Sequence, residues 1–193
     1  MNALLRQTDY VPHKLTVEDA VLLSEEGAFG DAKAELIDGV IYLMPADGEL
    51  HQDWTVALGR WLFDALGPEY AIVPGSTLRL GPHDGPSPDW YIFPAELKTG
   101  EVRGPDALLC IEQSDTSLRR NLKLKADLYS RFGVREYWVI DVKAQRLHRH
   151  REASPEGYRE LKPFGPEDVV ETLLIPGLTL RMANLPRVGR SGG

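Results

Sequence analysis

The sequence predicts a single α/β domain with a central mixed β-sheet flanked by helices. Apolar runs of strand length alternate along the chain with segments that have helical periodicity. One helical segment, 117–132, joins two apolar runs, 107–113 and 136–141, as a crossover between strands of one sheet does. A length of 193 residues fits one domain. We expect this domain over residues 1–186, and the basic, glycine-rich residues 187–193 as a disordered tail.

The N-terminal part predicts a capped helix, a β-hairpin and a longer helix. Segment 15–26 has Thr16 as its N-cap and acidic residues in its first turn. Segment 34–44 contains an Asp-Gly pair between two apolar runs, which predicts a hairpin because a type I′ turn needs residues that tolerate positive φ. Segment 50–66 repeats apolar residues at helical spacing and ends before a Gly-Pro pair.

The rest of the chain predicts strands around one further helix. Short apolar runs bounded by turn-forming residues are typical of strands, and the helical segment 117–132 ends at Gly133. The predicted strands are 70–73, 77–80, 89–93, 107–113, 136–141, 146–151, 158–162 and 169–175. This order favours a mixed sheet with short antiparallel pieces at its edges.

Composition and hydropathy favour an ordinary soluble protein. The chain is 42% hydrophobic and 26% charged, and no apolar stretch approaches the ~20 residues of a membrane span. Its single cysteine, Cys110, lies inside an apolar run, which favours a small buried side chain over a reactive thiol. With one cysteine and no signal-peptide pattern, we expect a cytoplasmic protein without membrane contact.

Charge is unevenly distributed along the chain. The net charge is −7, which does not by itself favour binding to nucleic acid. Residues 117–151, however, contain ten basic and three acidic residues, a local excess of seven positive charges. A solvated protein surface and a phosphate-binding surface are the two interpretations of such a segment.

One basic residue falls on the side of the 117–132 helix that faces the core. A projection at ~100° per residue puts Lys125 in the middle of the apolar stripe and Asn121 at its edge. A buried lysine must find an anion, extend its ammonium to water or lose its proton. Because Glu112 ends the preceding strand, a Glu112–Lys125 pair is geometrically reasonable, and extension to water is the alternative.

Two acidic residues lie at the ends of predicted strands. Asp89 begins the strand 89–93, and Glu112 closes the strand 107–113. If these strands are neighbours, the two carboxylates converge on one cation, and such a site suits Mg²⁺ or Mn²⁺. A lysine beside them can orient or help deprotonate a metal-bound water, or neutralise charge on a phosphate, which suits phosphodiester hydrolysis. Taken alone, Asp89 is equally typical of a turn before a strand.

The ordered set of Pro88-Asp89, Glu112 and Lys125 resembles the PD-(D/E)XK nuclease superfamily. More closely, the chain resembles the Uma-type putative restriction endonuclease family over about residues 16–180. The other matching positions are Glu35-Leu36-Ile37-Asp38-Gly39, His51, Ser114, Ser117-Leu118, Tyr129 and Gly133-Val134-Arg135-Glu136-Tyr137-Trp138. The resemblance implies a restriction-endonuclease-like α/β fold and nuclease activity.

The resemblance also implies roles for individual residues. Asp89 and Glu112 would bind the metal, Mg²⁺ or Mn²⁺, and Lys125 would position or activate the attacking water. Gln113 would offer its backbone carbonyl to the same metal. Glu35 matches an acidic position that contributes to such sites, and an ordinary charged hairpin residue is the alternative.

Some positions depart from the pattern of the family. Ser114 stands where the superfamily usually has its lysine, so Lys125 would supply the amine from the following helix. Asn121 replaces an aspartate that the family tends to have one helical turn before the lysine, and Gln113 replaces an apolar residue. His51 is a further candidate ligand or base, although a structural hydrogen bond at a helix start is the stronger interpretation of that residue.

We therefore expect a metal-dependent endonuclease that hydrolyses phosphodiester bonds in DNA, with residues 117–151 contacting phosphates. The alternative is a catalytically degenerate protein of the same fold that binds nucleic acid or protein. The acidic total charge and Asn121 favour that alternative. The resemblance also raises a homodimer formed through exposed edge strands.

Overall fold

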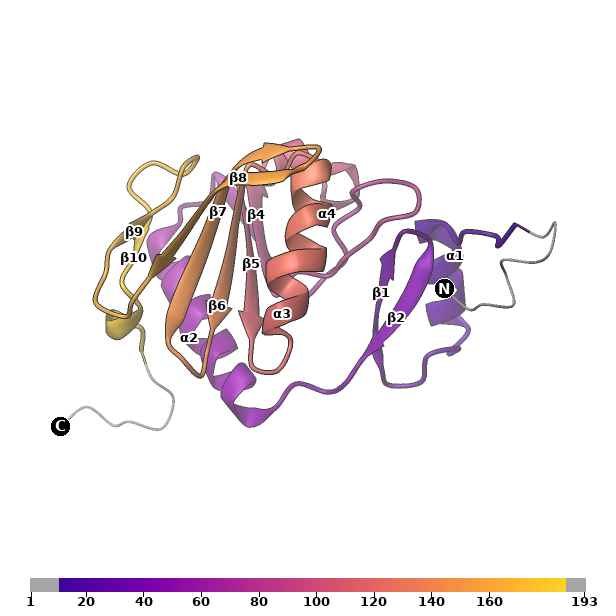
Figure 1. Ribbon diagram of the computed structural model, residues 1–193, viewed down its shortest axis with the longest axis horizontal. Helices are drawn as coiled ribbons and strands as arrows, with labels where there is room; N and C mark the ends of the chain where they lie inside the picture. The colour runs from indigo at the N-terminus through magenta and orange to yellow at the C-terminus, as the bar shows by residue number, and fades with distance from the viewer. Residues whose placement is uncertain (1–10, 187–193) are drawn as a thin grey trace.

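The computed structural model describes residues 11–186, which form a body around a β-sheet and a smaller N-terminal lobe (Figure 1). The tail predicted at 187–193 lies outside the described residues. Within residues 11–186, no helix is both long and apolar enough to cross a membrane.

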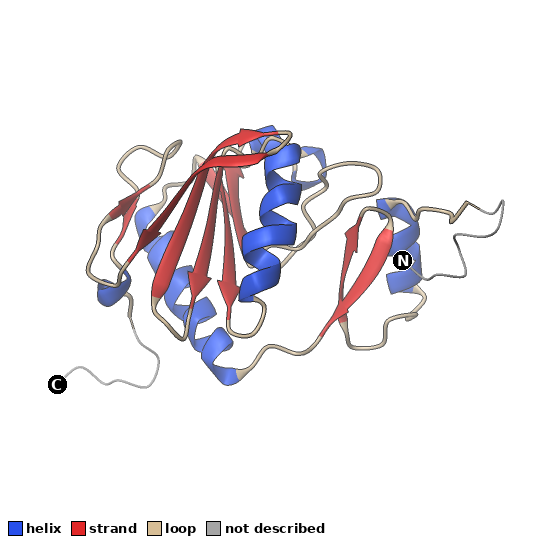
Figure 2. Cartoon of the chain, viewed as in Figure 1, coloured by secondary structure: helices blue, strands red, loops and turns tan. Residues whose placement is uncertain are grey.

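A six-stranded mixed sheet forms the centre of the body (Figure 2) and has the strand order β3-β4-β5-β6-β7-β8. Its strands are β3 (Tyr70–Pro74), β4 (Trp90–Pro94), β5 (Leu109–Ser114), β6 (Glu136–Asp141), β7 (Arg146–Ser154) and β8 (Gly157–Phe164). Neighbouring strands are antiparallel except β5 and β6, which run parallel. The predicted mixed sheet is confirmed.

Helices cover both faces of this sheet (Figures 1 and 2). On one face, α2 (Glu49–Ala65) packs Leu58 and Leu62 into a core that includes Trp90 and Trp138. These apolar side chains alternate along the strands with those of the opposite face, as the pleat of a strand requires.

The opposite face carries the helix that connects the parallel strands β5 and β6. This crossover helix consists of α3 (Leu118–Arg120), a π-helical turn η4 (Asn121–Lys125) and α4 (Ala126–Arg131). Parallel strands need such a connection, and α4 buries Leu128 and Tyr129 against the sheet. The predicted helix over 117–132 is therefore confirmed, but its middle is not a regular α-helix.

The N-terminal lobe consists of a helix and a separate β-hairpin. Its elements are α1 (Val17–Glu25), β1 (Lys33–Ile37) and β2 (Val40–Met44). The Thr16 hydroxyl accepts a 3.1 Å hydrogen bond from the Asp19 amide, as expected of an N-cap. In the hairpin turn, Asp38 and Gly39 have φ angles of 52° and 75°, so the predicted turn with two positive φ values is confirmed.

Residues 77–80 do not form the predicted strand. The Leu78 amide donates to the Pro86 carbonyl at 2.8 Å, and the Leu80 amide donates to the Asp84 carbonyl at 3.0 Å. The turn-rich residues 81–88 fold back on this segment, so its backbone groups pair within the loop instead of joining the sheet. The same loop connects the lobe to the body, because Gly85 forms a β-bridge with Leu36 of β1.

The C-terminal segment forms a second small sheet. The strand predicted over 169–175 is limited to β9 (Val170–Glu171), which pairs with β10 (Thr179–Leu180) outside the main sheet. Gly177 lies between them at a φ of 79°, where the chain turns. Within residues 11–186 there are also three short 3₁₀ helices: η2 (Thr99–Glu101), η3 (Gly104–Asp106) and η5 (Met182–Asn184).

Candidate functional site

Asp89 and Glu112 lie opposite each other at one end of the sheet. The ladder between β4 and β5 pairs Trp90 with Ile111 and Tyr91 with Cys110. One step further along the same register sets Asp89 against Glu112. The Asp89 carboxylate also accepts a 2.6 Å hydrogen bond from the Gln113 amide, which fixes it against the end of β5. The predicted neighbour relation of the two acidic strand ends is therefore confirmed.

Lys125 lies between two buried carboxylates. Its ammonium donates to Glu112 Oε1 at 2.6 Å and to Glu35 Oε1 at 2.7 Å. All three side chains are buried, and the Lys125 residue is only 2% exposed. The pair predicted between Glu112 and Lys125 is present, and the alternative, an ammonium extended to water, is wrong.

Glu35 belongs to this network. The sequence alone does not decide between a site residue and an ordinary charged hairpin residue at this position. Strand β1 brings it from the N-terminal lobe, where its Oε1 also accepts a 2.9 Å hydrogen bond from the Ser87 amide. Its other oxygen accepts a 2.5 Å bond from Arg120 of the crossover helix. The Tyr129 hydroxyl completes the set by donating to Glu112 at 3.0 Å. Glu35 is therefore not an ordinary charged hairpin residue.

The π-helical turn explains how one helix presents two polar residues inward. The Ala126 amide donates to the Asn121 carbonyl, five residues earlier, as in a π-helix. The Tyr137 hydroxyl donates to the same carbonyl at 3.2 Å. As a result Asn121 and Lys125 are both 2% exposed, so Asn121 lies inside the protein and not at the edge of the stripe. Single-turn π-bulges are frequent at functional sites.

Asn121, which departs from the family pattern, is hydrogen-bonded to Ser114, which departs from the superfamily signature. The Asn121 amide nitrogen donates to the Ser114 hydroxyl at 2.8 Å and to the Ser117 hydroxyl at 3.2 Å. A serine and an asparagine therefore form a neutral, satisfied pair beside the charged network. Neither residue leaves an uncompensated buried charge.

His51 contacts the candidate metal ligand Asp89, so the site includes a residue for which the sequence favours a structural hydrogen bond. It lies in the first turn of α2, with its Nε2 atom 3.4 Å from Asp89 Oδ2. This interaction raises the pKa of the His51 imidazole above its ordinary value, against the opposing effect of burial. Helical spacing in α2 could not reveal this contact, because it depends on where α2 crosses the rim of the sheet.

Charges and burial set the protonation of the three central groups. Burial is the largest effect at Glu112 and raises its pKa to about 7, although Lys125 acts against it. Burial alone would lower the pKa of the Lys125 ammonium, but the carboxylates of Glu112 and Glu35 outweigh it and raise that pKa. Burial would likewise raise the pKa of Asp89, yet His51 and the Gln113 amide hold it below its ordinary value.

The two carboxylates face a small cavity. It has a volume of about 150 Å³ and is lined by residues that include Asp89, Glu112, Lys125 and Arg120. Among the described residues, hydrogen bonds reach only Oδ2 of Asp89 and only Oε1 of Glu112. One oxygen of each carboxylate therefore remains available to a ligand.

This donor set fits Mg²⁺ or Mn²⁺. Residues 11–186 contain no group of three or more histidine, cysteine or acidic side chains arranged to hold a metal. Mg²⁺, however, keeps several waters and is usually bound through one or two carboxylates together with substrate phosphates. Asp89 and Glu112 provide the two carboxylates. The Gln113 side chain is hydrogen-bonded to Thr55 at 3.1 Å, so only its backbone carbonyl is a candidate ligand.

Comparisons with known proteins agree with this fold. Residues 22–183 match the Uma2 family, described as putative restriction endonuclease. A comparison with curated proteins finds no match. Among solved structures, the chain is similar to the crystal structure of a putative nuclease belonging to DUF820 from Anabaena variabilis ATCC 29413, at 16% identity and a TM-score of 0.65. That similarity covers 78% of this chain and 88% of the other, and it confirms the expected fold class. Because the family match spans most of the sequence, the chain belongs to the Uma2 putative restriction endonuclease family.

Proposed function

We propose that the protein is a Mg²⁺- or Mn²⁺-dependent endonuclease that hydrolyses phosphodiester bonds in DNA. One observation carries this proposal: the buried Lys125 ammonium lies between Glu35 and Glu112, next to a cavity that Asp89 also lines. Burying a lysine together with two carboxylates carries a desolvation cost, so this arrangement favours a specific role for Lys125. Membership of a family described as putative restriction endonuclease supports a nuclease-type reaction.

The residues of this chain would divide the chemistry between them. Asp89 and Glu112 would hold the metal ion, which when bound makes water a better nucleophile and neutralises phosphate charge. Lys125 stays protonated because its pKa is raised, so it acts as a donor and not as a base. Two of its three N–H groups bond to the carboxylates of Glu35 and Glu112. The third has no acceptor among residues 11–186, so it would donate to a phosphate oxygen or to the attacking water.

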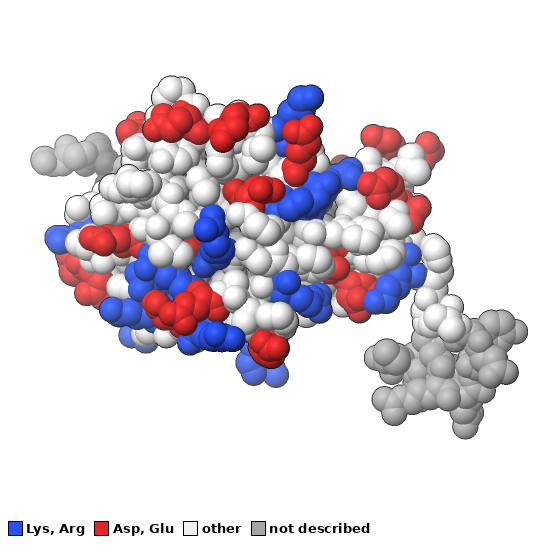
Figure 3. Space-filling view, turned by 90° about the horizontal axis from the view of Figure 1, so that it is seen from above, with Lys and Arg blue, Asp and Glu red and all other residues white. Residues whose placement is uncertain are grey.

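DNA as the substrate is supported by basic side chains around the crossover helix, although fewer of them are available than the sequence suggests. Arg120, Lys125 and Arg151 form ion pairs with buried carboxylates. Arg119 and Lys123 are exposed on the outer side of the helix. Acidic and basic side chains are interspersed over the face in Figure 3, so phosphate contacts would be local and not spread over a uniformly positive surface.

Cleavage assays with matched variants test the proposal. The purified protein is incubated with duplex and single-stranded DNA in Mg²⁺ or Mn²⁺, and we expect cleavage that Asp89→Ala and Lys125→Met each abolish. Asp127→Ala and Lys162→Met change exposed residues outside the cavity and should cleave like the wild type. No cleavage above the Asp89→Ala background in either metal would reject the catalytic claim.

Metal binding separates this proposal from the degenerate alternative. Calorimetric titration with Mn²⁺ should give binding to the wild-type protein and no binding to Asp89→Ala. The neutral pair of Asn121 and Ser114 is the observation that favours the alternative, because it replaces an acidic position with an amide. A protein that binds DNA, ignores Mn²⁺ and does not cleave would be a binding module of nuclease fold.

A further inference from the structure

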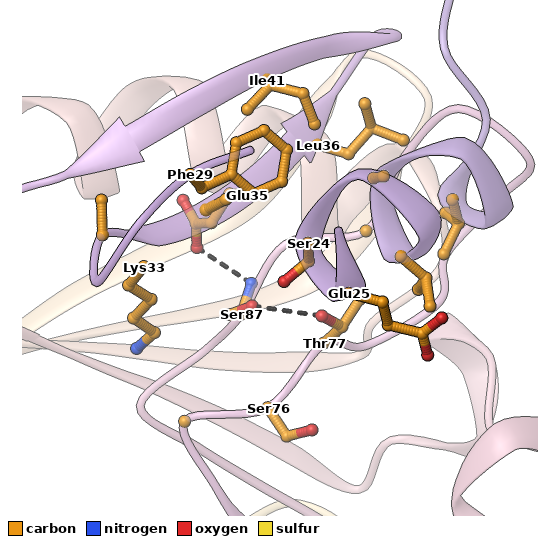
Figure 4. Close-up of a pocket in the computed structure, with 17 residues that line it drawn as sticks. Ser24, Glu25, Phe29, Lys33, Glu35, Leu36, Ile41, Ser76, Thr77 and Ser87 are labelled. Carbon is orange, nitrogen blue, oxygen red and sulfur yellow. Dashed lines mark hydrogen bonds between the residues drawn. The ribbon is translucent and has the colours of Figure 1, made fainter. Parts of the chain in front are cut away.

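A second cavity lies beside the carboxylate pocket, between α1, the β1–β2 hairpin and the loop that follows β3 (Figure 4). Its volume is about 380 Å³. Phe29, Leu36 and Ile41 supply apolar lining, and the hydroxyls of Ser76 and Thr77 lie on the other side. A cavity of this size that combines apolar side chains with polar groups is typical of a small-molecule site.

The two cavities share a wall. Lys33 and Ser87 line both of them. Glu35 lines the larger cavity, while its Oε1 atom bonds to Lys125 in the smaller one at 2.7 Å. A ligand that occupies both cavities would therefore pass Lys33 and lie close to Glu35.

Lys33 is a cation without a carboxylate partner among the described residues. The nearby Glu35 carboxylate already accepts hydrogen bonds from Ser87, Arg120 and Lys125. Its charge is therefore compensated, and the Lys33 ammonium remains available to an anion at the shared wall.

We propose that the larger cavity binds one unstacked nucleobase of the DNA strand whose phosphodiester enters the carboxylate pocket, and that Lys33 contacts a phosphate between them. This inference rests on the proposed function. A base has two apolar faces and a polar edge, which match the Phe29 ring and the hydroxyls across the cavity. The required order of base, backbone phosphate and cleaved bond follows the order of the cavity, Lys33 and the carboxylates. The protein would thus act on single-stranded DNA, or on duplex from which it extrudes a base.

Binding of a fluorescent single-stranded oligonucleotide, measured by anisotropy in Ca²⁺ to suppress cleavage, tests the base site. Stacking on an aromatic side chain predicts that Phe29→Ala weakens binding about tenfold, and that Phe29→Trp retains it. Phe63→Ala removes an aromatic ring that is 61% exposed on α2 and serves as the matched control. Lys33→Gln should weaken binding and reduce the salt slope by about 0.7, the value for one phosphate contact on a single strand.

Oligonucleotides with one abasic site at successive positions identify the bound base. At one position, removal of the base should weaken wild-type binding as much as Phe29→Ala does, and the two changes together should cost no more than either alone. Additive losses at every position would overturn the base site. If Phe29→Ala proves unstable by thermal unfolding, Ala20→Phe fills the same cavity from α1 and should give the same loss.

The outcomes for the base site and for the nuclease are distinguishable. Cleavage by the wild type, with Phe29→Ala behaving like Phe63→Ala, overturns the base site and leaves the nuclease standing. Binding with the abasic coupling but without cleavage keeps the base site and rejects the nuclease. A protein that neither binds nor cleaves DNA overturns both.

Discussion

Lys125 is the residue whose loss should affect the fold most directly. Lys125→Met leaves the buried carboxylates of Glu35 and Glu112 without their shared cation. Breaking a buried pair in this way costs about 3–5 kcal/mol of unfolding free energy. Chemical denaturation at pH 8 measures the loss. The loss should be smaller at pH 5, because Glu112, whose pKa is raised to about 7, is then largely protonated.

The neighbouring Lys123 gives the control for this prediction. It lies on the same helical segment with an exposed side chain, so Lys123→Met should change the unfolding free energy by less than about 0.5 kcal/mol. Equal losses for the two variants would mean that the Lys125 network contributes nothing beyond an ordinary lysine position.

His150 should make the unfolding free energy depend on pH in the acidic range. The residue is 3% exposed, and its ring centroid lies 5.2 Å from that of Tyr137 and 5.5 Å from that of Tyr158. Burial lowers its pKa to about 4. Between pH 6.5 and 4 the unfolded chain therefore binds a proton that the folded protein does not. Stability from this residue is present above pH 6.5 and decreases by about 3 kcal/mol as the pH falls to 4.

Denaturation curves collected from pH 4 to pH 7 check this sign. His150→Phe removes the titrating group while keeping an aromatic ring against both tyrosines, so the slope of unfolding free energy against pH should become flatter in that window. A variant that keeps the full wild-type slope would assign the acid sensitivity to other groups.

At the scale of the elements, the middle and the end of the crossover helix are fixed in different ways. Its middle is fixed by the π-turn, whose Asn121 carbonyl accepts from both the Ala126 amide and the Tyr137 hydroxyl. Its end is fixed by close packing, because the Phe132 carbonyl approaches the backbone of Gly104 in the loop before β5. The helix that carries Lys125 is thus held at a defined rotation and a defined height above the sheet.

Gly104→Ala tests the second of these contacts. An added Cβ would lie 2.0 Å from the Phe132 carbonyl oxygen, which is backbone and has no alternative rotamer. We expect a loss of about 3 kcal/mol or more in unfolding free energy, at the upper end of overpacking costs.

Gly100→Ala, in the same loop, is the matched substitution for Gly104→Ala. A Cβ at Gly100 meets no atom within 4 Å, so this change should stay within about 0.5 kcal/mol of the wild type. Similar unfolding free energies for the two variants would show that the helix end shifts without cost, and that the contact with Gly104 does not fix its height.

At the scale of the whole molecule, the sequence predicts the order of the elements and the convergence of Asp89, Glu112 and Lys125. Periodicity and turn signals are sufficient for this, because strand ends and helix faces follow from local patterns. The role of Glu35 was not decided by sequence, since its contact with Lys125 spans 90 residues and depends on how the lobe packs on the body. The π-turn was also missed, because a projection at a constant ~100° per residue has no place for an extra residue.

The segment 77–80 and the basic run show the same limit. Residues 77–80 have strand-like composition, but the loop that follows them satisfies their backbone groups first. The positive charge of residues 117–151 predicts a basic surface. Arg120, Lys125 and Arg151, however, form ion pairs with buried carboxylates. Charged residues can be counted from the sequence, but the sequence does not separate those that stabilise the fold from those that contact a ligand.

That separation can be measured with two variants of the basic run. Arg151 contacts Glu136 through its Nε at 2.8 Å and its Nη2 at 2.7 Å, and the Glu136 side chain is 0% exposed. Arg151→Gln should therefore cost about 3–5 kcal/mol of unfolding free energy, because it leaves a buried carboxylate without its cation. The slope of DNA affinity against salt should be that of the wild type when binding is measured well below the unfolding temperature.

The double variant Arg119→Gln/Lys123→Gln should behave in the opposite way. Both side chains are exposed on the outer side of the crossover helix, so the unfolding free energy should stay close to that of the wild type. If each contacts one phosphate, the salt slope for duplex DNA falls by about 1.8, since each contact contributes about 0.9. A wild-type slope in the double variant would reject this helix surface as a phosphate contact. A large loss of stability in it would mean that these residues, like Arg151, serve the fold.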